Sequence, residues 1–167
     1  PKQYFLQWRD EEVEKELGGE LEMTLYSLLS KLNFMDIVQN FILFEKEKEK
    51  IVKKMARYQQ MRATNKIVER VIGKEKRQGL IWHTQGSGKT LTMYFTAWKL
   101  RFNKQLANPK VFILVDRVDL DDQIFETFTN AGGKNIVRVT SRRDLEEKIQ
   151  SPEKGIFITT IQKLSEL

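Results

Sequence analysis

The chain has 167 residues, of which 40% are apolar and none is cysteine, and its formal net charge is +6. This length allows one domain with a hydrophobic core, or one domain and an appendage, and a chain with no cysteine and a single histidine builds neither a disulfide framework nor a clustered metal site. No apolar run is long enough to span a membrane and residues 1–8 lack the pattern of a signal peptide, so we expect a cytoplasmic protein without a membrane partner.

The charge is unevenly distributed along the chain. Residues 1–44 hold 4 Lys and Arg against 8 Asp and Glu, and the rest of the chain holds 25 against 15. The basic second part can face a nucleic acid, because clustered Lys and Arg supply the salt-dependent part of such binding. A solvated, lysine-rich surface explains the same composition, so composition alone leaves both interpretations open.

The first predicted elements are two packed helices. Apolar residues with helical spacing define two stripes, Leu21, Leu25, Leu28, Leu29 and Leu32, then Ile37, Val38, Phe41 and Ile42. The alternating charges of residues 45–50 favour an exposed helix or linker, and we place the domain boundary there. From Ile51 a further helical pattern runs through Met55, Tyr58 and Met61 to Gly73.

Beyond Gly79 the period changes, and short apolar runs alternate with helical stretches. The predicted strands are 80–82, 111–115, 136–139 and 156–159, and the predicted helices are 90–102, 118–130 and 142–150. Ser141 with Asp144 resembles a capping box at the start of the last helix. This alternation predicts an α/β fold with a parallel sheet and right-handed crossovers.

The stretch LIWHTQGSGKTLTMYF combines a strand, a glycine turn and a helix. Glycines let successive backbone N–H groups wrap around a phosphate at the helix N-terminus, a lysine bridges the terminal phosphates, and the next hydroxyl binds Mg²⁺. The residues in these positions are Gln85, Gly86, Ser87, Gly88, Lys89 and Thr90. The strict pattern has glycine where this chain has His83, to which we assign no catalytic role. The alternative is a glycine turn with a surface lysine, but strand, loop and helix in this order favour nucleotide binding.

Asp116 ends the apolar run 111–115 and allows two interpretations. In nucleotidases whose acidic strand directly follows the loop helix, Asp116 orders Mg²⁺. In helicase-like motors another strand intervenes, and the acid comes later with a second carboxylate beside it. Because Arg117 follows Asp116, no acid pair is present there, which favours the motor.

Four motifs together resemble a known family. MARYQQ, IWHTQGSGKTLTM, VFILVDRVDLDDQ and IFITTIQKL occur in this order and at about this spacing in the motor subunit of type I restriction enzymes. These are superfamily 2 DNA translocases that also carry a nuclease domain. The resemblance covers residues 21–167, because LLSKLNFMDIVQNFILFE resembles the helical segment that joins nuclease to motor. Histidine in the first position of HTQGSGKT is usual in this family.

The resemblance implies roles for individual residues. Lys89 would bind the β and γ phosphates of ATP, Thr90 would ligate Mg²⁺, and Gln60 resembles the adenine-reading glutamine, whose amide offers both a donor and an acceptor. An exposed helix residue is the alternative for Gln60. The segments 116–123 and 159–163 resemble those lining the DNA path, so the implied phosphate contacts are Arg117, Thr160, Gln162 and Lys163. For these, a helix cap and a surface lysine are the alternatives.

The resemblance also implies what lies elsewhere. No acid-pair motif follows residues 156–159, and the second motor lobe with its arginine finger and the nuclease are not found in these 167 residues. We therefore expect a fragment in which 1–44 is the connector, 45–50 a charged linker and 51–167 part of a RecA-like ATPase lobe. The implied partners are double-stranded DNA and the modification and specificity subunits. Another superfamily 2 motor and a non-catalytic nucleotide-binding module are the alternatives.

Overall fold

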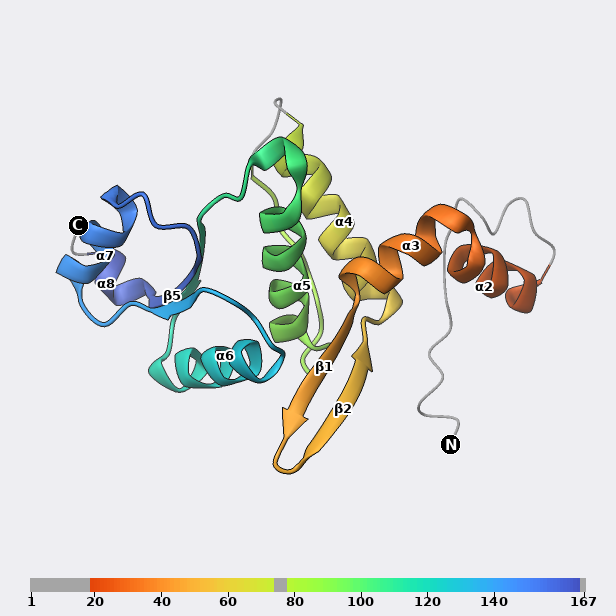
Figure 1. The fold of residues 1–167 in the computed structure, drawn as a ribbon, viewed down its shortest axis with the longest axis horizontal. Helices are drawn as coiled ribbons and strands as arrows, with labels where there is room; N and C mark the ends of the chain where they lie inside the picture. The colour runs from red at the N-terminus through yellow and green to blue at the C-terminus, as the bar shows by residue number, and fades with distance from the viewer. Residues whose placement is uncertain (1–18, 74–77, 166–167) are drawn as a thin grey trace.

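The computed structural model describes residues 19–73 and 78–165 (Figure 1). In chain order its elements are α2 (Glu20–Leu29), α3 (Lys31–Asn40), β1 (Ile42–Glu47), β2 (Lys50–Met55), α4 (Tyr58–Ile72), α5 (Lys89–Phe102), the 3₁₀ helix η2 (Lys104–Leu106), β3 (Val111–Val115), α6 (Val118–Asn130), β4 (Ile136–Arg138), α7 (Arg142–Gln150), β5 (Ile156–Thr160) and α8 (Ile161–Ser165). None of the helices in these ranges is both long and apolar enough to cross a membrane.

Strands β3, β5 and β4 form a parallel sheet in that order, with β5 in the centre. All five residues of β5 are buried, as expected for a central strand covered on both faces. The α/β class with a parallel sheet is therefore confirmed. The helices predicted at 90–102, 118–130 and 142–150 correspond to α5, α6 and α7, and Ser141 Oγ accepts a hydrogen bond from Asp144 N at 3.1 Å as the capping box predicts.

Alternate residues of β5 face two different apolar clusters. Ile158 packs in the main cluster with Ile113 of β3 and with the buried faces of α5 and α6. Phe157 points the other way and packs with Leu145 of α7. Tyr94 of α5 joins α6, because its ring lies 5.1 Å from that of Phe128. The sheet is thus covered on both faces by helices that the sequence places between the strands.

The stretch 80–82 is not a strand in this structure, contrary to the prediction. It runs as an extended segment without strand pairing in the described chain, and the side chains of Leu80 and Trp82 are 84% and 86% exposed. A strand forms only where a neighbour takes up its backbone N–H and C=O groups. Among the described residues no strand pairs with it, so the apolar run alone was not sufficient.

Residues 45–50 do not form a helix, which was one of the two interpretations given for them, and the helix predicted from Ile51 begins later. Strands β1 and β2 form an antiparallel hairpin whose turn is Lys48 and Glu49, and α4 begins only at Tyr58. Ile51, Met55 and Tyr58 fit a helical spacing, but residues 50–55 fit an alternating strand pattern equally well. Pairing with β1 selects the strand over the helix for residues 50–55. The division into domains at 45–50 stays a prediction.

The segment before the hairpin packs directly on the helix that follows the glycine loop. Lys99 Nζ of α5 lies 2.6 Å from both carboxylate oxygens of Asp36 in α3 and 2.7 Å from Asn65 Oδ1 in α4. The ring of Phe41 lies 5.7 Å from that of Phe95, and both side chains are fully buried. Helices α3, α4 and α5 therefore share one core.

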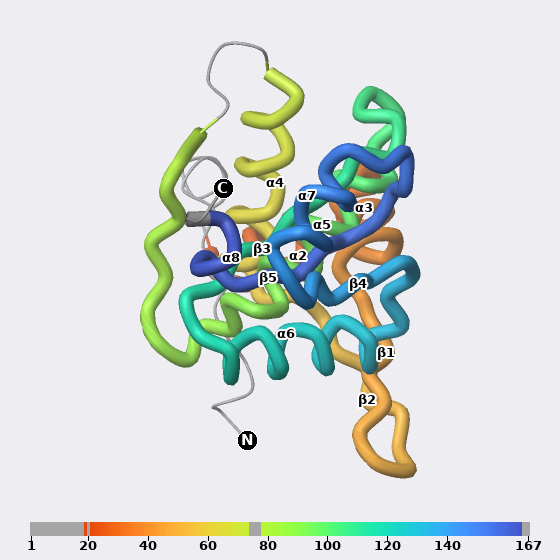
Figure 2. The backbone as a smooth tube through the Cα atoms, turned by 90° about the vertical axis from the view of Figure 1, so that its left-hand side faces the viewer, coloured from red at the N-terminus to blue at the C-terminus, as the bar shows by residue number. Residues whose placement is uncertain are grey.

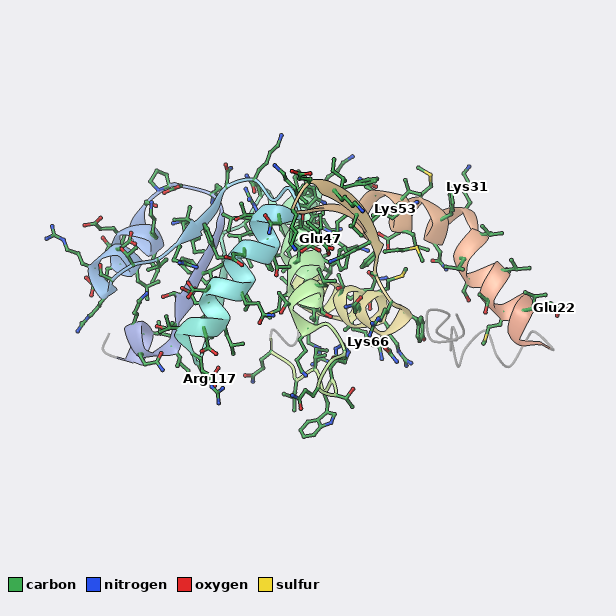
Figure 3. The ribbon with its side chains drawn as sticks, turned by 90° about the horizontal axis from the view of Figure 1, so that it is seen from below. Glu22, Lys31, Glu47, Lys53, Lys66 and Arg117 are labelled. Carbon is green, nitrogen blue, oxygen red and sulfur yellow. The ribbon has the colours of Figure 1, made fainter. Side chains whose placement is uncertain are left out.

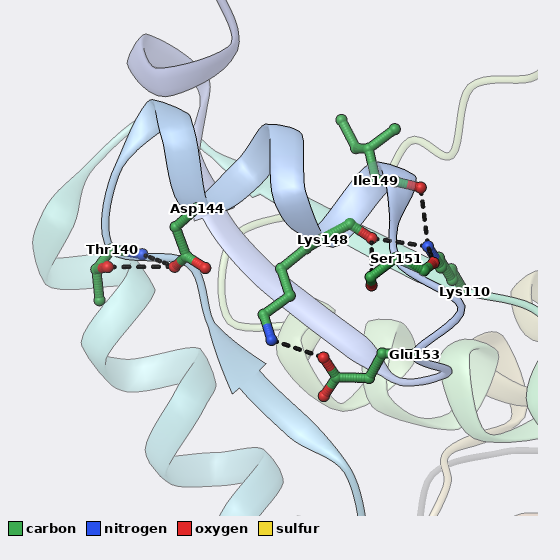
Figure 4. Close-up of polar contacts among 7 residues, drawn as sticks. All are labelled: Lys110, Thr140, Asp144, Lys148, Ile149, Ser151 and Glu153. Atoms are coloured by element: carbon green, nitrogen blue, oxygen red, sulfur yellow. Dashed lines mark hydrogen bonds and ion pairs between the residues drawn. The ribbon is translucent and has the colours of Figure 1, made fainter.

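Lys110, which precedes β3, caps the C-terminus of α7 (Figure 4). Its Nζ donates to Lys148 O at 2.7 Å, to Ile149 O at 2.8 Å and to Ser151 O. The last carbonyls of a helix have no partner within the helix and carry partial negative charge, so a lysine satisfies both needs. This bond set fastens α7 to the sheet.

Replacing Lys110 with methionine is expected to lower the free energy of unfolding by about 1–3 kcal/mol, because half-buried carbonyls lose a charged donor. Denaturant unfolding followed by circular dichroism measures the change. Lys154→Met, an exposed lysine in the following loop, is the control and is expected to change stability by less than about 0.5 kcal/mol. Equal midpoints for the two variants would show that the cap contributes nothing.

Candidate nucleotide-binding site

The glycine loop leads directly into the N-terminus of α5. Gly86 and Gly88 have φ angles of 76° and 79°, in the left-handed region that glycine adopts without strain. Ser87 N donates to Thr84 O at 3.3 Å, which closes the turn, and α5 starts at Lys89. The first N–H groups of a helix have no partner inside it, so this junction offers donors and positive potential to an anion.

Lys89 lies across its own loop. Its Nζ donates to Thr84 O at 2.8 Å, and the side chain is exposed. Thr90, half-buried, is the next residue of the helix, and Gln85 is exposed in the turn. Ser87 Oγ is buried and has no hydrogen-bond partner among the described residues. An orphaned hydroxyl, two left-handed glycines and a lysine in one turn fit a phosphate group.

Gln60 joins α4 to this loop. Its Nε2 donates to Gly88 O at 2.9 Å and to Ser87 O at 3.3 Å, while its Oε1 accepts from Arg57 N at 2.8 Å. The residue is only 2% exposed. Both ends of the Gln60 amide are therefore hydrogen-bonded to backbone groups. Through these bonds Gln60 connects the start of α4 to the glycine loop and supports it.

The same contact and the backbone conformation both favour glycine at position 88. A Cβ atom built on Gly88 would lie 2.5 Å from Gln60 Nε2, closer than any stable contact, and the positive φ would add strain. Gly86 has open space at the corresponding position. The two glycines thus serve different purposes, since Gly86 supplies the turn alone and Gly88 also leaves room for the amide.

A cavity of about 440 Å³ adjoins the loop, between α4, α5 and β3. Lys89 and His83 line it together with apolar side chains that include Ile81, Met93 and Phe112. His83 is half-buried. The cavity walls near the loop are therefore mostly apolar, with the lysine as the charged group.

The residues predicted to contact DNA gather at the carboxyl edge of the sheet. Arg117 is exposed directly after β3, whereas Thr160, at the end of β5, is only 4% exposed. Gln162 Nε2 donates to Asp116 O at 2.8 Å, and Lys163 Nζ donates to Val139 O at 2.6 Å. Short helix α8 thus ties the ends of three parallel strands together, and Arg117 and Gln162 are the two candidates that are exposed.

Figures 2 and 3 show the glycine loop and the start of α6 on the same side of the molecule. Arg117, labelled in Figure 3, projects on this side. Carboxyl ends of parallel strands form the usual ligand-binding edge of an α/β sheet. No group of three or more metal-ligating side chains is found among the described residues, so Thr90 is the one metal ligand that the loop sequence itself suggests.

Sequence reasoning missed the part of the site that consists of backbone acceptors. The carbonyls of Thr84, Ser87 and Gly88 hold Lys89 and Gln60 in place. A carbonyl group belongs to every residue, so no residue type signals its use. The pairing of Gln60 with the loop, 28 positions further along the chain, likewise depends on how α4 packs on α5.

Replacing Gln60 with alanine is expected to weaken ATP and GTP binding by a similar factor, about fivefold or more, because the loop loses its support and buried carbonyls lose a donor. Calorimetric titration with both nucleotides measures this. The matched control is Gln59→Ala, which removes an exposed amide from the same turn of α4. Selective loss of ATP binding would instead establish Gln60 as an adenine-reading residue.

The chain is similar to known ATPases and restriction enzyme subunits. The family model of the SWI2/SNF2 ATPase matches residues 59–167, which begin next to Gln60 and include the glycine loop. The type I restriction enzyme HindI endonuclease subunit of Haemophilus influenzae is 37% identical over 158 residues, covering 87% of this chain and 15% of its own length. The chain therefore spans about 15% of that relative.

Two further relatives carry related names. The type I restriction enzyme SsaAORF53P endonuclease subunit of Staphylococcus saprophyticus is 38% identical over 87 residues, which are 52% of this chain and 9% of that protein. A protein of Mycoplasma pneumoniae named as the C-terminal part of the MpnIIP type I restriction enzyme endonuclease subunit is 30% identical over 173 residues, covering 97% of this chain and 81% of that protein. The chain belongs to the family of type I restriction enzyme endonuclease subunits, and residues 59–167 lie in its SWI2/SNF2 ATPase part.

Proposed function

We propose that this chain is the ATP-binding part of a DNA-translocating motor subunit, whose parent protein couples ATP hydrolysis to movement along double-stranded DNA and to cleavage. The observation that carries the proposal is the junction of the glycine loop with α5, where Lys89 and free helix N–H groups meet. Membership in an ATPase family supports the choice of nucleotide. The modification and specificity subunits of a restriction complex are the proposed protein partners.

In this proposal each loop residue has a distinct task. The backbone N–H groups of residues 85–90 surround the phosphates, and Gly86 and Gly88 keep the path open. Lys89 exchanges the Thr84 carbonyl for the β and γ phosphates, and its positive charge makes that contact stronger than a neutral hydrogen bond. Thr90 offers a hydroxyl to Mg²⁺, which when bound neutralises charge on the phosphates.

Gln60 is proposed to support the loop, and adenine recognition is the alternative role that selective loss of ATP binding in Gln60→Ala would establish. Because both ends of its amide contact backbone groups here, Gln60 can reach a base only by giving up its bonds to Gly88 and Ser87. The proposed phosphate contacts, which would not select a sequence, come from the side chains of Arg117, Gln162 and Lys163. The Thr160 side chain is buried, so Thr160 would contribute by holding the end of β5 in place.

The dependence of binding on Mg²⁺ tests the proposal. Thr90→Val removes the hydroxyl at nearly constant volume, so it is expected to weaken ATP binding in Mg²⁺ by about 1.5–3 kcal/mol, roughly tenfold or more, and to change binding in EDTA little. Calorimetry in the two buffers gives both values. Thr92→Val is a poorer control because Thr92 is buried, whereas Thr129→Val removes an exposed hydroxyl from α6. Equal losses in both buffers would contradict a metal-binding role.

Two alternative functions can be distinguished from the proposed one by experiment or by the parent sequence. Another superfamily 2 motor would bind ATP in the same way, but its parent would carry no nuclease. A non-catalytic interaction module would bind its partners equally well without Lys89. The names of the relatives favour the restriction motor over both.

A further inference from the structure

The β1–β2 hairpin separates its charges between two faces. In the antiparallel register Glu47 lies opposite Lys50 and Glu45 opposite Val52, and successive residues point to opposite faces. Lys54 contacts Glu45 and, at 2.7 Å, Glu47, so both strand glutamates pair on one face. These hydrogen bonds raise the pKa of Lys54. We call this the inner face, because Leu43 on the same face is buried in the main core.

The outer face, defined by residues 42, 44, 46, 51, 53 and 55, has no carboxylate. Its two charged residues, Lys46 and Lys53, make no ion pair with any described residue, and both are exposed. Lys53 lies opposite Phe44 and Lys46 opposite Ile51. Lysine stems pack along apolar neighbours while the ammonium groups reach outwards, so this face presents positive charge above an apolar base.

The position of the hairpin leaves this face accessible. Figure 2 shows β1 and β2 extending away from the other described elements, on the side opposite the glycine loop. In Figure 3, Lys53 and Arg117 lie on opposite sides of the ribbon. At the tip, Lys48 and Lys50 flank the single carboxylate of Glu49. The hairpin is therefore a projecting ribbon whose unpaired charges are mostly positive.

We infer that the outer face of this hairpin contacts the phosphate backbone of duplex DNA, at a site separate from the carboxyl edge of the sheet. Unpaired lysines without neighbouring carboxylates complement a polyanion, and a two-stranded ribbon has the width that the major groove admits, about 12 Å. Phosphate contacts of this kind position a protein without reading sequence. The inference rests on the proposed function only in taking duplex DNA as the partner.

The test compares double variants in a DNA-binding assay. Lys46→Gln with Lys53→Gln keeps polar side chains at both positions and removes two charges, and Lys104→Gln with Lys154→Gln removes two charges from exposed positions elsewhere. Fluorescence anisotropy with a short labelled duplex, over a series of salt concentrations, gives the slope of log affinity against log salt. The hairpin variant is expected to lower this slope by about two units, equally for duplexes of different sequence, and the control is expected to leave it unchanged. Circular dichroism verifies that both variants fold.

The possible outcomes separate this inference from the proposed function. A slope equal to that of the control variant overturns the inference, and loss of slope in Arg117→Gln alone would then leave the carboxyl edge as the DNA site. If Phe44→Ser with Ile51→Ser lowers DNA affinity as much as the lysine variant does, without altering the salt slope, the face acts by apolar contact and the inference is wrong. No DNA binding by the unmodified chain at low salt overturns both the inference and the proposed DNA partner.

Discussion

Replacing Lys89 with alanine is expected to lower the affinity for ATP by about 1.5–3 kcal/mol, which is roughly tenfold or more. The lost group is a charged donor at the entrance to a helix N-terminus, where a phosphate would replace the Thr84 carbonyl. Because the Lys89 side chain is exposed and its hydrogen bond of 2.8 Å stays within its own loop, its removal should leave the fold intact. Isothermal calorimetry with ATP and Mg²⁺ measures the change.

The control for this variant is Lys104→Ala, which removes an exposed lysine from η2. It corrects for the general loss of one positive charge, which weakens binding of any anion slightly. Equal ATP affinity for Lys89→Ala and the control would contradict the assignment of the loop as a phosphate site. ADP titrated alongside ATP shows how much of the effect concerns the terminal phosphate.

The sequence predicted the fold well where the spacing of apolar residues fits only one type of secondary structure. The helices α5, α6 and α7 follow clear apolar stripes between strands, and the burial of β5 follows from its continuous apolar run. The loop was identified because Gly86, Gly88 and Lys89 have few other uses in that spacing. In these cases the residue types and their spacing within one segment were sufficient to predict the element.

The hairpin could not be predicted in this way, because its identity depends on long-range pairing. Residues 45–50 alternate in sign, and such alternation stabilises a helix at i,i+3 as well as a strand pair across a turn. Lys48 has a φ of 54° at the turn, a position that normally favours glycine or asparagine. The turn therefore lacks the glycine or asparagine by which a hairpin is usually recognised in a sequence.

The residues of the candidate site stay a prediction, and the structure adds contacts among them that the sequence does not show. Sequence placed Gln60 upstream of the loop, but its burial and its bonds to Gly88 and Ser87 follow from the packing of α4 on α5. The bonds of Gln162 and Lys163 to strand-end carbonyls depend likewise on tertiary structure. A sequence motif predicts which residues take part in the site, whereas their contacts depend on the tertiary structure.

The second large effect concerns turnover, since the 167-residue chain is expected to bind ATP but to hydrolyse it slowly. Hydrolysis requires a carboxylate that orders Mg²⁺, a second that positions water and a cation that stabilises the transferring phosphoryl group. Asp116 is exposed at the end of β3, but Arg117 follows it. The adjacent carboxylates Asp121 and Asp122 in α6 are both paired with Arg138, at 3.3 and 2.9 Å.

The measurement is steady-state ATP hydrolysis by this chain, with and without duplex DNA, beside a polypeptide in which this sequence is joined to a second motor lobe. The chain alone is expected to be slower by about a thousandfold or more, the effect of a missing arginine finger alone. Lys89→Ala serves as the background control in both proteins. Fast hydrolysis by the chain that depends on Lys89 and disappears in Asp116→Asn would contradict this prediction. Asp116 would then be the carboxylate that orders the metal, and the loop, β3 and Asp116 together would form a complete nucleotidase rather than part of a motor.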